Sequence, residues 1–165
     1  MNPVDVHDLL HKPGASRKWR RAETLASLST EMASVPERAP VTIDVLLESV
    51  VEGILATGSL SGQMSFRCAR CLKDFEGDFD VRVRELFTHA PHEDGDDYPI
   101  TEGVIDLEPC VRDALVLSMP FSPLCRDDCL GLCSRCGGDR NIGECACGPE
   151  VDARWAALSS LQLDN

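Results

Sequence analysis

Eight of the nine cysteines in this 165-residue chain fall into four close pairs. The pairs have CxxC, CxxxC, CxxC and CxC spacing, and in chain order they are Cys68/Cys71, Cys125/Cys129, Cys133/Cys136 and Cys145/Cys147. A structural zinc ion takes four ligands in a tetrahedron, and two thiolates a few residues apart can supply half of such a site. The four pairs therefore predict two structural zinc sites, each with four cysteine ligands.

Chain order favours one combination of these half-sites. Gly137 and Gly138 follow the third pair, as in a zinc knuckle whose backbone N–H groups point at the sulfur atoms. The third and fourth pairs would then close one compact site, and the first and second pairs would join a strand hairpin to a distant segment. CxC is the least usual of these spacings, so Cys145 or Cys147 could instead be a spectator, with Cys129 shared differently.

Other cysteine chemistries fit less well. A redox CxxC motif needs a helix N-terminus in a βαβ setting, which neither CARC (68–71) nor CSRC (133–136) has. The spacings differ from the usual ferredoxin runs. The opening MNPVDVHDLLHKPG lacks the pattern of a signal peptide, so we expect a cytoplasmic protein in which disulfides are rare. All-thiolate sites are usually closed, and the chain has no P-loop, HExxH or GxSxG motif, so we expect neither an enzyme nor a small-molecule substrate.

Hydrophobic periodicity predicts the elements that must position the cysteines. Apolar residues alternate over 41–87, which predicts an antiparallel meander of three or four strands with CARC in a turn between two of them. Three helices are expected, over residues 4–11, 106–119 and 150–163. Asp106 is the expected N-cap of the second helix, and Cys110 is interpreted as a small core residue. The prediction is one α+β domain over residues 1–165, a β-meander packed with a few helices, plus a Cys-rich zinc ribbon over 125–147.

The net charge of −12 indicates which kinds of partner the protein attracts. Such a chain is repelled, on average, by nucleic acid and by anionic membranes, and a basic protein is its natural electrostatic complement. No stretch approaches the roughly 18 apolar residues of a membrane-spanning helix, so no membrane contact is expected. Acidic residues gather over 88–105, which we interpret as an exposed loop.

Basic residues gather in two places, over 11–21 and over 67–84. The first stretch has five Lys or Arg and no acidic residue. It is interpreted either as a solvated loop with Trp19 packed on the body, or as an RNA contact in which Trp19 stacks on a base. The candidate contact residues for RNA or a protein partner are Lys12, Arg17, Lys18, Trp19, Arg20, Arg21, Arg67 and Arg70.

Several motifs, in this order, resemble the YceD family. They are FRCARCL at 66–72, IDLEPCVRDALVLSMPFSPLC at 105–125, DDCLGLCSRCG at 127–137, CAC at 145–147 and DARWAALSSL at 152–161. The opening VDVHDLLHKPGASR resembles that of actinobacterial and other Gram-positive members, so the resemblance covers nearly the whole chain. One departure is Asp139-Arg140-Asn141, where the family usually has Asn-Leu-Asn.

The resemblance implies a cytoplasmic ribosome-biogenesis factor linked to accumulation of large-subunit ribosomal RNA (rRNA), with the four cysteine pairs as ligands. Combined with the acidic charge, it leads to a first hypothesis, in which the protein binds a basic ribosomal protein of the large subunit and helps deliver it to nascent rRNA. The second hypothesis is direct contact with large-subunit rRNA through residues 12–21 and 67–84. The third, from another class, is a thiol redox or metal-dependent enzyme.

Overall fold

The structure is a computed structural model, and it describes residues 1–90, 97–143, 145–147 and 154. These residues form nine β-strands and one α-helix. In chain order the elements are β1 Val4–Asp5, β2 Ser16–Thr24, β3 Leu28–Ser29, β4 Ala33–Val35, β5 Pro40–Val50, β6 Gly53–Arg67, β7 Asp74–Thr88, β8 Tyr98–Thr101, β9 Val104–Ile105 and α1 Glu108–Ser118. The described part is thus mostly strand with one helix, and the expected α+β class with a few helices is met only in part.

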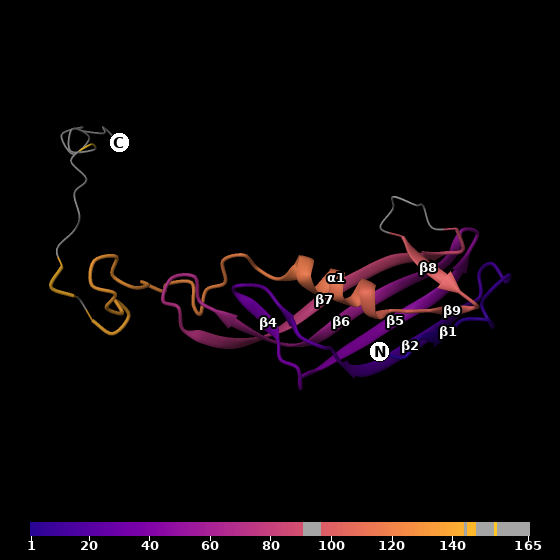
Figure 1. The fold of residues 1–165 in the computed structure, drawn as a ribbon, viewed down its shortest axis with the longest axis horizontal. Helices are drawn as coiled ribbons and strands as arrows, with labels where there is room; N and C mark the ends of the chain where they lie inside the picture. The colour runs from indigo at the N-terminus through magenta and orange to yellow at the C-terminus, as the bar shows by residue number, and fades with distance from the viewer. Residues whose placement is uncertain (91–96, 144, 148–153, 155–165) are drawn as a thin grey trace.

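A long antiparallel sheet of β2, β5, β6 and β7 forms the body of the molecule (Figure 1). β5 lies between β2 and β6, and β7 pairs with the other side of β6 along its whole length. Three of these strands, β5 to β7, follow one another in sequence and in space, as the alternation over 41–87 predicted. The CARC turn connects β6 to β7, also as predicted.

The short strands extend this sheet at its two ends. β8 runs parallel to the end of β7, β9 pairs with β8, and β1 pairs with β9. At the other end of β6, β4 pairs through Ala33 and Phe66, and β3 forms a hairpin with β4. The cysteine-rich segments lie beyond this second end, away from β8 and β9 (Figure 1).

One face of the sheet carries the hydrophobic core. The two-residue period of β5 buries Val41, Ile43, Val45 and Leu47, and Leu60 of β6 joins them. Helix α1 lies over this face (Figure 1) and contributes its buried side chains to the same core. Those side chains are Cys110, Val111 and Leu115. The interpretation of Cys110 as a small core residue is therefore confirmed.

Two predictions for the N-terminal part are wrong. Residues 4–11 do not form a helix: they contain β1 and a single turn, in which the N–H groups of Leu9 and Leu10 donate to the Val6 carbonyl. The stretch over 11–21 is not a loop, because residues from Ser16 onward belong to β2 and pair with β5. Charged side chains occupy both faces of β2, so this strand lacks the apolar alternation that would reveal it. Trp19 is half-buried and packs against the core, which agrees with the interpretation that placed it on the body of the protein.

The acidic segment 88–105 is only partly a loop. β8 and β9 form a hairpin within it, and residues 91–96 lie outside the described residues. The helix expected over 106–119 is observed as α1, but its N-cap is Leu107 and not the expected Asp106. The Asp106 carboxylate, one residue earlier, still accepts the N–H of Glu108 at 2.9 Å. The helix expected over 150–163 lies, Arg154 apart, outside the described residues. Among the described helices there is none with the length and apolar character needed to cross a membrane.

Candidate metal centre

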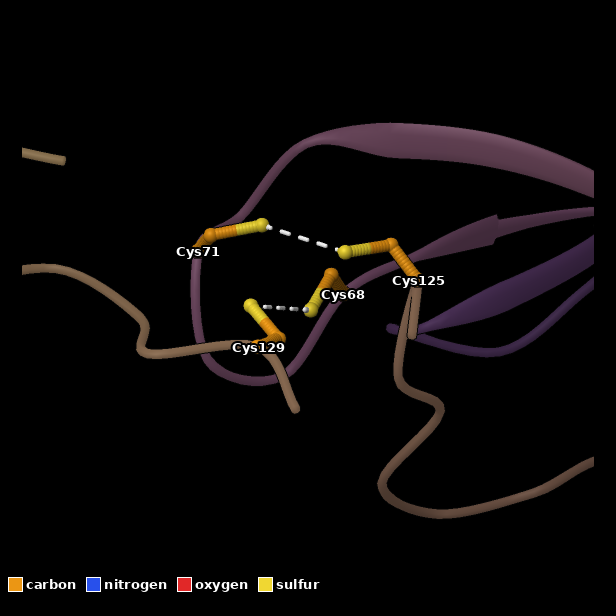
Figure 2. A group of neighbouring side chains, drawn as sticks. All are labelled: Cys68, Cys71, Cys125 and Cys129. Atoms are coloured by element: carbon orange, nitrogen blue, oxygen red, sulfur yellow. Dashed lines mark hydrogen bonds between the residues drawn. The ribbon is translucent and has the colours of Figure 1, made fainter. Parts of the chain in front are cut away.

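The first cysteine group joins two segments that are far apart in sequence. Cys68 and Cys71 lie in the turn after β6, and Cys125 and Cys129 lie in the segment after α1. Figure 2 shows the four side chains pointing toward one centre. The Cys68 and Cys129 sulfur atoms are 3.8 Å apart, and those of Cys71 and Cys125 are 3.7 Å apart.

These distances fit a single tetrahedral metal ion. Four sulfur atoms at about 2.3 Å from one ion, at the corners of a tetrahedron, stand about 3.8 Å from one another. All four sulfur atoms of the group lie within 4.8 Å of one another. Three of the four residues are buried, and Cys125 is exposed. The group can therefore hold one metal ion at the end of the sheet.

A second group of four cysteines lies farther along the chain. Cys133, Cys136, Cys145 and Cys147 also place their sulfur atoms within 4.8 Å of one another. Cys136 is exposed and the other three are half-buried, so this group is more open to solvent than the first. The structure brings together the half-sites in the combination that chain order favoured. None of the nine cysteines forms a disulfide bond. Metal ligation by these residues stays a prediction.

The two CxxC turns have the same backbone structure. In each, the N–H of the first cysteine donates to the carbonyl five residues later, and its own carbonyl accepts the N–H four residues later, at 2.8–2.9 Å. In each, the residue after the second cysteine has a positive φ, 58° at Leu72 and 69° at Gly137. Glycine adopts this conformation without strain, whereas for leucine it costs about 1 kcal/mol. The chain therefore builds the same knuckle twice.

Backbone N–H groups favour a thiolate at the first cysteine of each turn. Burial raises the pKa of Cys68, but three backbone N–H groups directed at its sulfur outweigh burial and lower the pKa to about 6. At Cys133 the N–H groups of Cys136 and Arg135, helped by the Cys145 side chain, lower the pKa to about 6. Because metal ions bind the thiolate form, both turns are prepared for a cation before it arrives.

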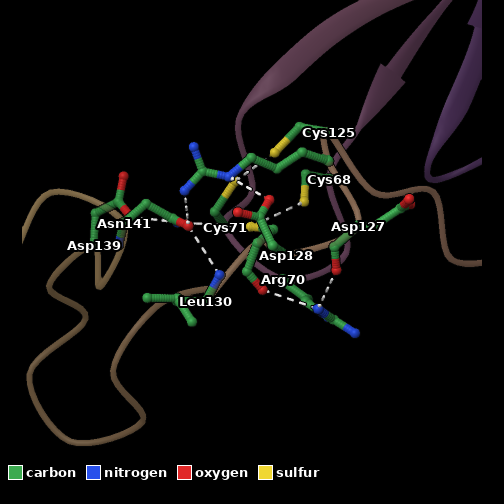
Figure 3. A network of polar contacts seen from close by, with 11 residues as sticks. Cys68, Arg70, Cys71, Cys125, Asp127, Asp128, Leu130, Asp139 and Asn141 are labelled. Carbon is green, nitrogen blue, oxygen red and sulfur yellow. Dashed lines mark hydrogen bonds and ion pairs between the residues drawn. The ribbon is translucent and has the colours of Figure 1, made fainter.

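Arg70, in the CARC turn, forms hydrogen bonds with the segment that carries Cys129. Its guanidinium donates to the carbonyl oxygens of Asp127, at 3.2 Å, and Cys129, at 2.9 Å (Figure 3). The Arg70 carbonyl accepts the N–H of Leu132 at 3.0 Å, and a Cβ on Gly131 would approach that carbonyl oxygen to 2.9 Å. Gly131 also has a φ of 71°. The absence of a side chain at this position thus lets the segment after Cys129 pass close to the CARC turn.

The segment between the two pairs of the second group reaches back to the first group. The Asn141 side-chain oxygen accepts the N–H of Leu130 at 2.8 Å, and its nitrogen donates to the Cys129 sulfur at 3.6 Å (Figure 3). Asp139 forms an ion pair with Lys73 at 2.6 Å. This pair, with hydrogen bonds from Asn141, lowers the pKa of Asp139 to about 2. Cysteine spacing alone did not reveal these two residues; their signal was an Asp-x-Asn sequence, which is typical of a side-chain-stabilised turn.

The predicted contact residues do not share one surface. Arg17, Trp19 and Arg21 alternate along β2 with Lys18 and Arg20, so the two sets lie on opposite faces of the sheet. Several of these cations have partners within the protein: Arg17 pairs with Asp8, Arg20 with Asp44, Arg67 with Asp74, and Arg21 lies over the Trp19 ring. Lys12 is exposed in the turn before β2.

The ninth cysteine stays apart from both groups. Burial, and then the carboxylates of Glu85 and Asp113, raise the pKa of Cys110 to about 12. A buried thiol that stays protonated is a poor nucleophile and a poor metal ligand. Cys110 therefore acts in packing.

Comparisons with known proteins place this site in a family. The family model described as large ribosomal RNA subunit accumulation protein YceD matches residues 56–162, a range that includes all four cysteine pairs. An uncharacterized protein of Mycobacterium tuberculosis is 33% identical over 172 residues, which cover 96% of this chain and 80% of that protein. One of Mycobacterium leprae is 30% identical over 171 residues, 98% of this chain and 78% of that protein. YlbN of Bacillus subtilis is 26% identical over 161 residues, 94% of each. No solved structure matches the chain significantly. The chain belongs to the YceD family of large ribosomal RNA subunit accumulation proteins.

Proposed function

We propose that this protein is a non-enzymatic, cytoplasmic ribosome-biogenesis factor that supports accumulation of large-subunit rRNA. The observation that carries the proposal is family membership, since the family description names rRNA accumulation and the match spans residues 56–162. The location of the thiols supports a non-enzymatic role, because eight of them gather in two groups that could each hold a metal ion and the ninth is buried in the core.

Zinc is the proposed metal in both groups. Four thiolates in a tetrahedron are typical of structural zinc sites. The 3.7–3.8 Å separations in the first group fit one ion, whereas in a four-iron cluster each thiolate binds a different iron and the sulfur atoms stand farther apart. Bound zinc would supply the cross-link that holds the CARC turn against the segment after α1. Its role is therefore structural, and its free energy of binding contributes to folding.

The proposed partner is a basic ribosomal protein of the large subunit. The net charge of −12 favours a basic partner, and a groove of about 650 Å³ between α1, β7 and β8 combines negative charge with apolar surface. Glu85, Asp97 and Asp113 supply the carboxylates, and Val116 and Leu117 supply the apolar side. The Leu117 side chain is 86% exposed, and the Tyr98 hydroxyl donates to Asp113 at 2.8 Å and orients its carboxylate. This chemistry complements a basic segment with an apolar anchor.

A pull-down at native salt tests the partner. The tagged protein is expected to retain one large-subunit ribosomal protein in a stoichiometric complex that survives nuclease treatment. Glu85→Gln with Asp113→Asn should weaken this complex at least about tenfold, because two carboxylates of the groove lose their charge. Glu76→Gln with Asp78→Asn removes the same charge from exposed positions of β7 and is the matched control. Loss of the partner on nuclease treatment, or equal weakening by the control pair, would contradict the proposal.

A further inference from the structure

The register of the sheet brings the two basic segments of the sequence onto one face. Arg20 of β2 is opposite Asp44 of β5, Asp44 is opposite Ser59 of β6, and Ser59 is opposite Arg82 of β7. Residues opposite one another on antiparallel strands have their side chains on the same face. This row therefore places an arginine at each side of the four-stranded sheet.

The neighbouring row repeats the arrangement. Lys18 is opposite Leu46, Leu46 is opposite Thr57, and Thr57 is opposite Arg84. Each member of this row lies two residues from its counterpart in the first row, so the two rows share a face. That face is the outer one, because the alternate residues of β5 and β6 are buried in the core on the other side. Lys18, Arg20, Arg82 and Arg84 are all exposed.

These four cations form two pairs with a polar strip between them. Adjacent strands are about 4.8 Å apart, so three strand spacings separate β2 from β7 by about 14 Å. Ser59 lies in the strip and supplies a hydroxyl group, whereas the Thr57 hydroxyl is buried. Within the part of the chain that the structure describes, Lys18, Arg82 and Arg84 have no ion-pair partner, and the Arg20–Asp44 pair is a long surface contact of 3.5 Å. The flanking rows bring in carboxylates at Glu48 and Asp80, which bound the positive surface.

We propose that this outer face, defined by Lys18, Arg20, Arg82 and Arg84, binds the phosphate backbone of RNA. Four cations against one carboxylate make the two rows locally positive on a chain of net charge −12, so the attraction acts at short range. Arginine matches phosphate through its fork of N–H donors. The two rows hold no aromatic side chain, so the face contacts backbone and not bases. Trp19, a candidate for base stacking from the sequence, lies on the opposite face and packs against the core.

The choice of RNA among polyanions rests on the proposed function, whereas the arrangement of charges does not. This protein would have a groove for a basic protein on one side of the sheet and a phosphate-binding face on the other. It could therefore hold both components of an assembling subunit.

The test measures binding of the full-length, zinc-loaded protein to an in vitro transcript of large-subunit rRNA and to single-stranded poly(U), over a range of salt concentrations. Arg82→Ala with Arg84→Ala should weaken binding to both probes alike and reduce the slope of log affinity against log salt by about two, because two phosphate contacts are lost. Arg38→Ala with Arg140→Ala removes the same charge from exposed positions outside the two rows and should leave both quantities unchanged. Circular dichroism and zinc content, unchanged in all variants, exclude misfolding.

Three results would overturn the inference. The first is an arginine variant that binds RNA as tightly as the wild type, and the second is a control variant that weakens binding equally. The third is an arginine variant that still binds RNA but loses the nuclease-resistant complex with the ribosomal protein, which would make this face a protein contact. The proposed function can fail separately from this surface. If RNA binding depends on this face but cells without the protein accumulate rRNA normally, the function is refuted and the phosphate-binding surface is supported.

Discussion

The side-chain nitrogen of Asn141 donates to the sulfur of Cys129 at 3.6 Å, although Asn141 lies between two ligands of the other cysteine group. Its oxygen also accepts the N–H of Leu130 and a guanidinium N–H of Arg126, both at 2.8 Å. One side chain therefore connects the two candidate metal sites. Closing the second group would hold Asn141 in place and so support the first.

Asn141→Ala is expected to weaken metal retention in the first group by about 10–100-fold, which is the usual effect of losing a residue that positions a ligand. Transfer of metal to a chromophoric chelator measures it. Arg140→Ala, an exposed neighbour, is the control and should retain metal as the wild type does. Unchanged retention in Asn141→Ala would show that the contact with Cys129 has no energetic importance.

The ion pair between Lys73 and Asp139 joins the CARC turn to the second knuckle at 2.6 Å. Lys73→Met leaves the carboxylate without its cation and should lower the melting temperature. A double-mutant cycle with Asp139→Asn should show a combined effect smaller than the sum. The pKa of Asp139 is lowered from 3.8 to about 2, so this pair stabilises the folded state above about pH 4 and its contribution is lost as the pH falls through about 2. Additive effects at neutral pH would contradict this coupling.

Elemental analysis tests the two-site assignment. The wild type should contain two zinc ions per chain, and Cys68→Ser and Cys133→Ser should each contain one, because each substitution removes one ligand from a different group. Cys110→Ala should keep both ions, since that thiol lies in the core. One zinc in the wild type would disprove one of the sites, and iron would disprove the choice of metal.

Two leucines of α1 should separate stability from partner binding. Leu115 is fully buried, and Leu115→Ala should lower the free energy of unfolding by about 2–5 kcal/mol. Leu117 is 86% exposed, so Leu117→Ala should leave urea unfolding unchanged and weaken the complex with the proposed ribosomal-protein partner. A Leu117→Ala protein that binds its partner normally would place the contact elsewhere.

The parts of this architecture that sequence could predict are those with a local signal. Each cysteine pair is close in sequence, so the half-sites and their favoured combination were visible before the fold. The buried period of Val41, Ile43 and Val45 likewise predicted β5. β2 was missed because Arg17, Lys18 and Arg20 charge both of its faces, and its pairing with β5 is a long-range property.

The two basic rows could not be predicted for a related reason. Arg20 and Arg82 share a row only through the register of β5 and β6 between them, and register is set by pairing along the whole sheet. The sequence grouped Lys18 and Arg20 with Arg17, Trp19 and Arg21, and strand geometry divides this group between two faces. The contacts of Asn141 and Asp139 with the first cysteine group depend in the same way on how two turns pack.

The most direct test of the central claim is the ratio of large- to small-subunit rRNA in cells that lack this protein. The account predicts a lower ratio, restored by the wild-type gene but not by a Cys68→Ser, Cys71→Ser gene, whose product lacks two ligands of the proposed metal site between the β6–β7 turn and the segment after α1. An unchanged ratio in cells without the protein would contradict the proposed function.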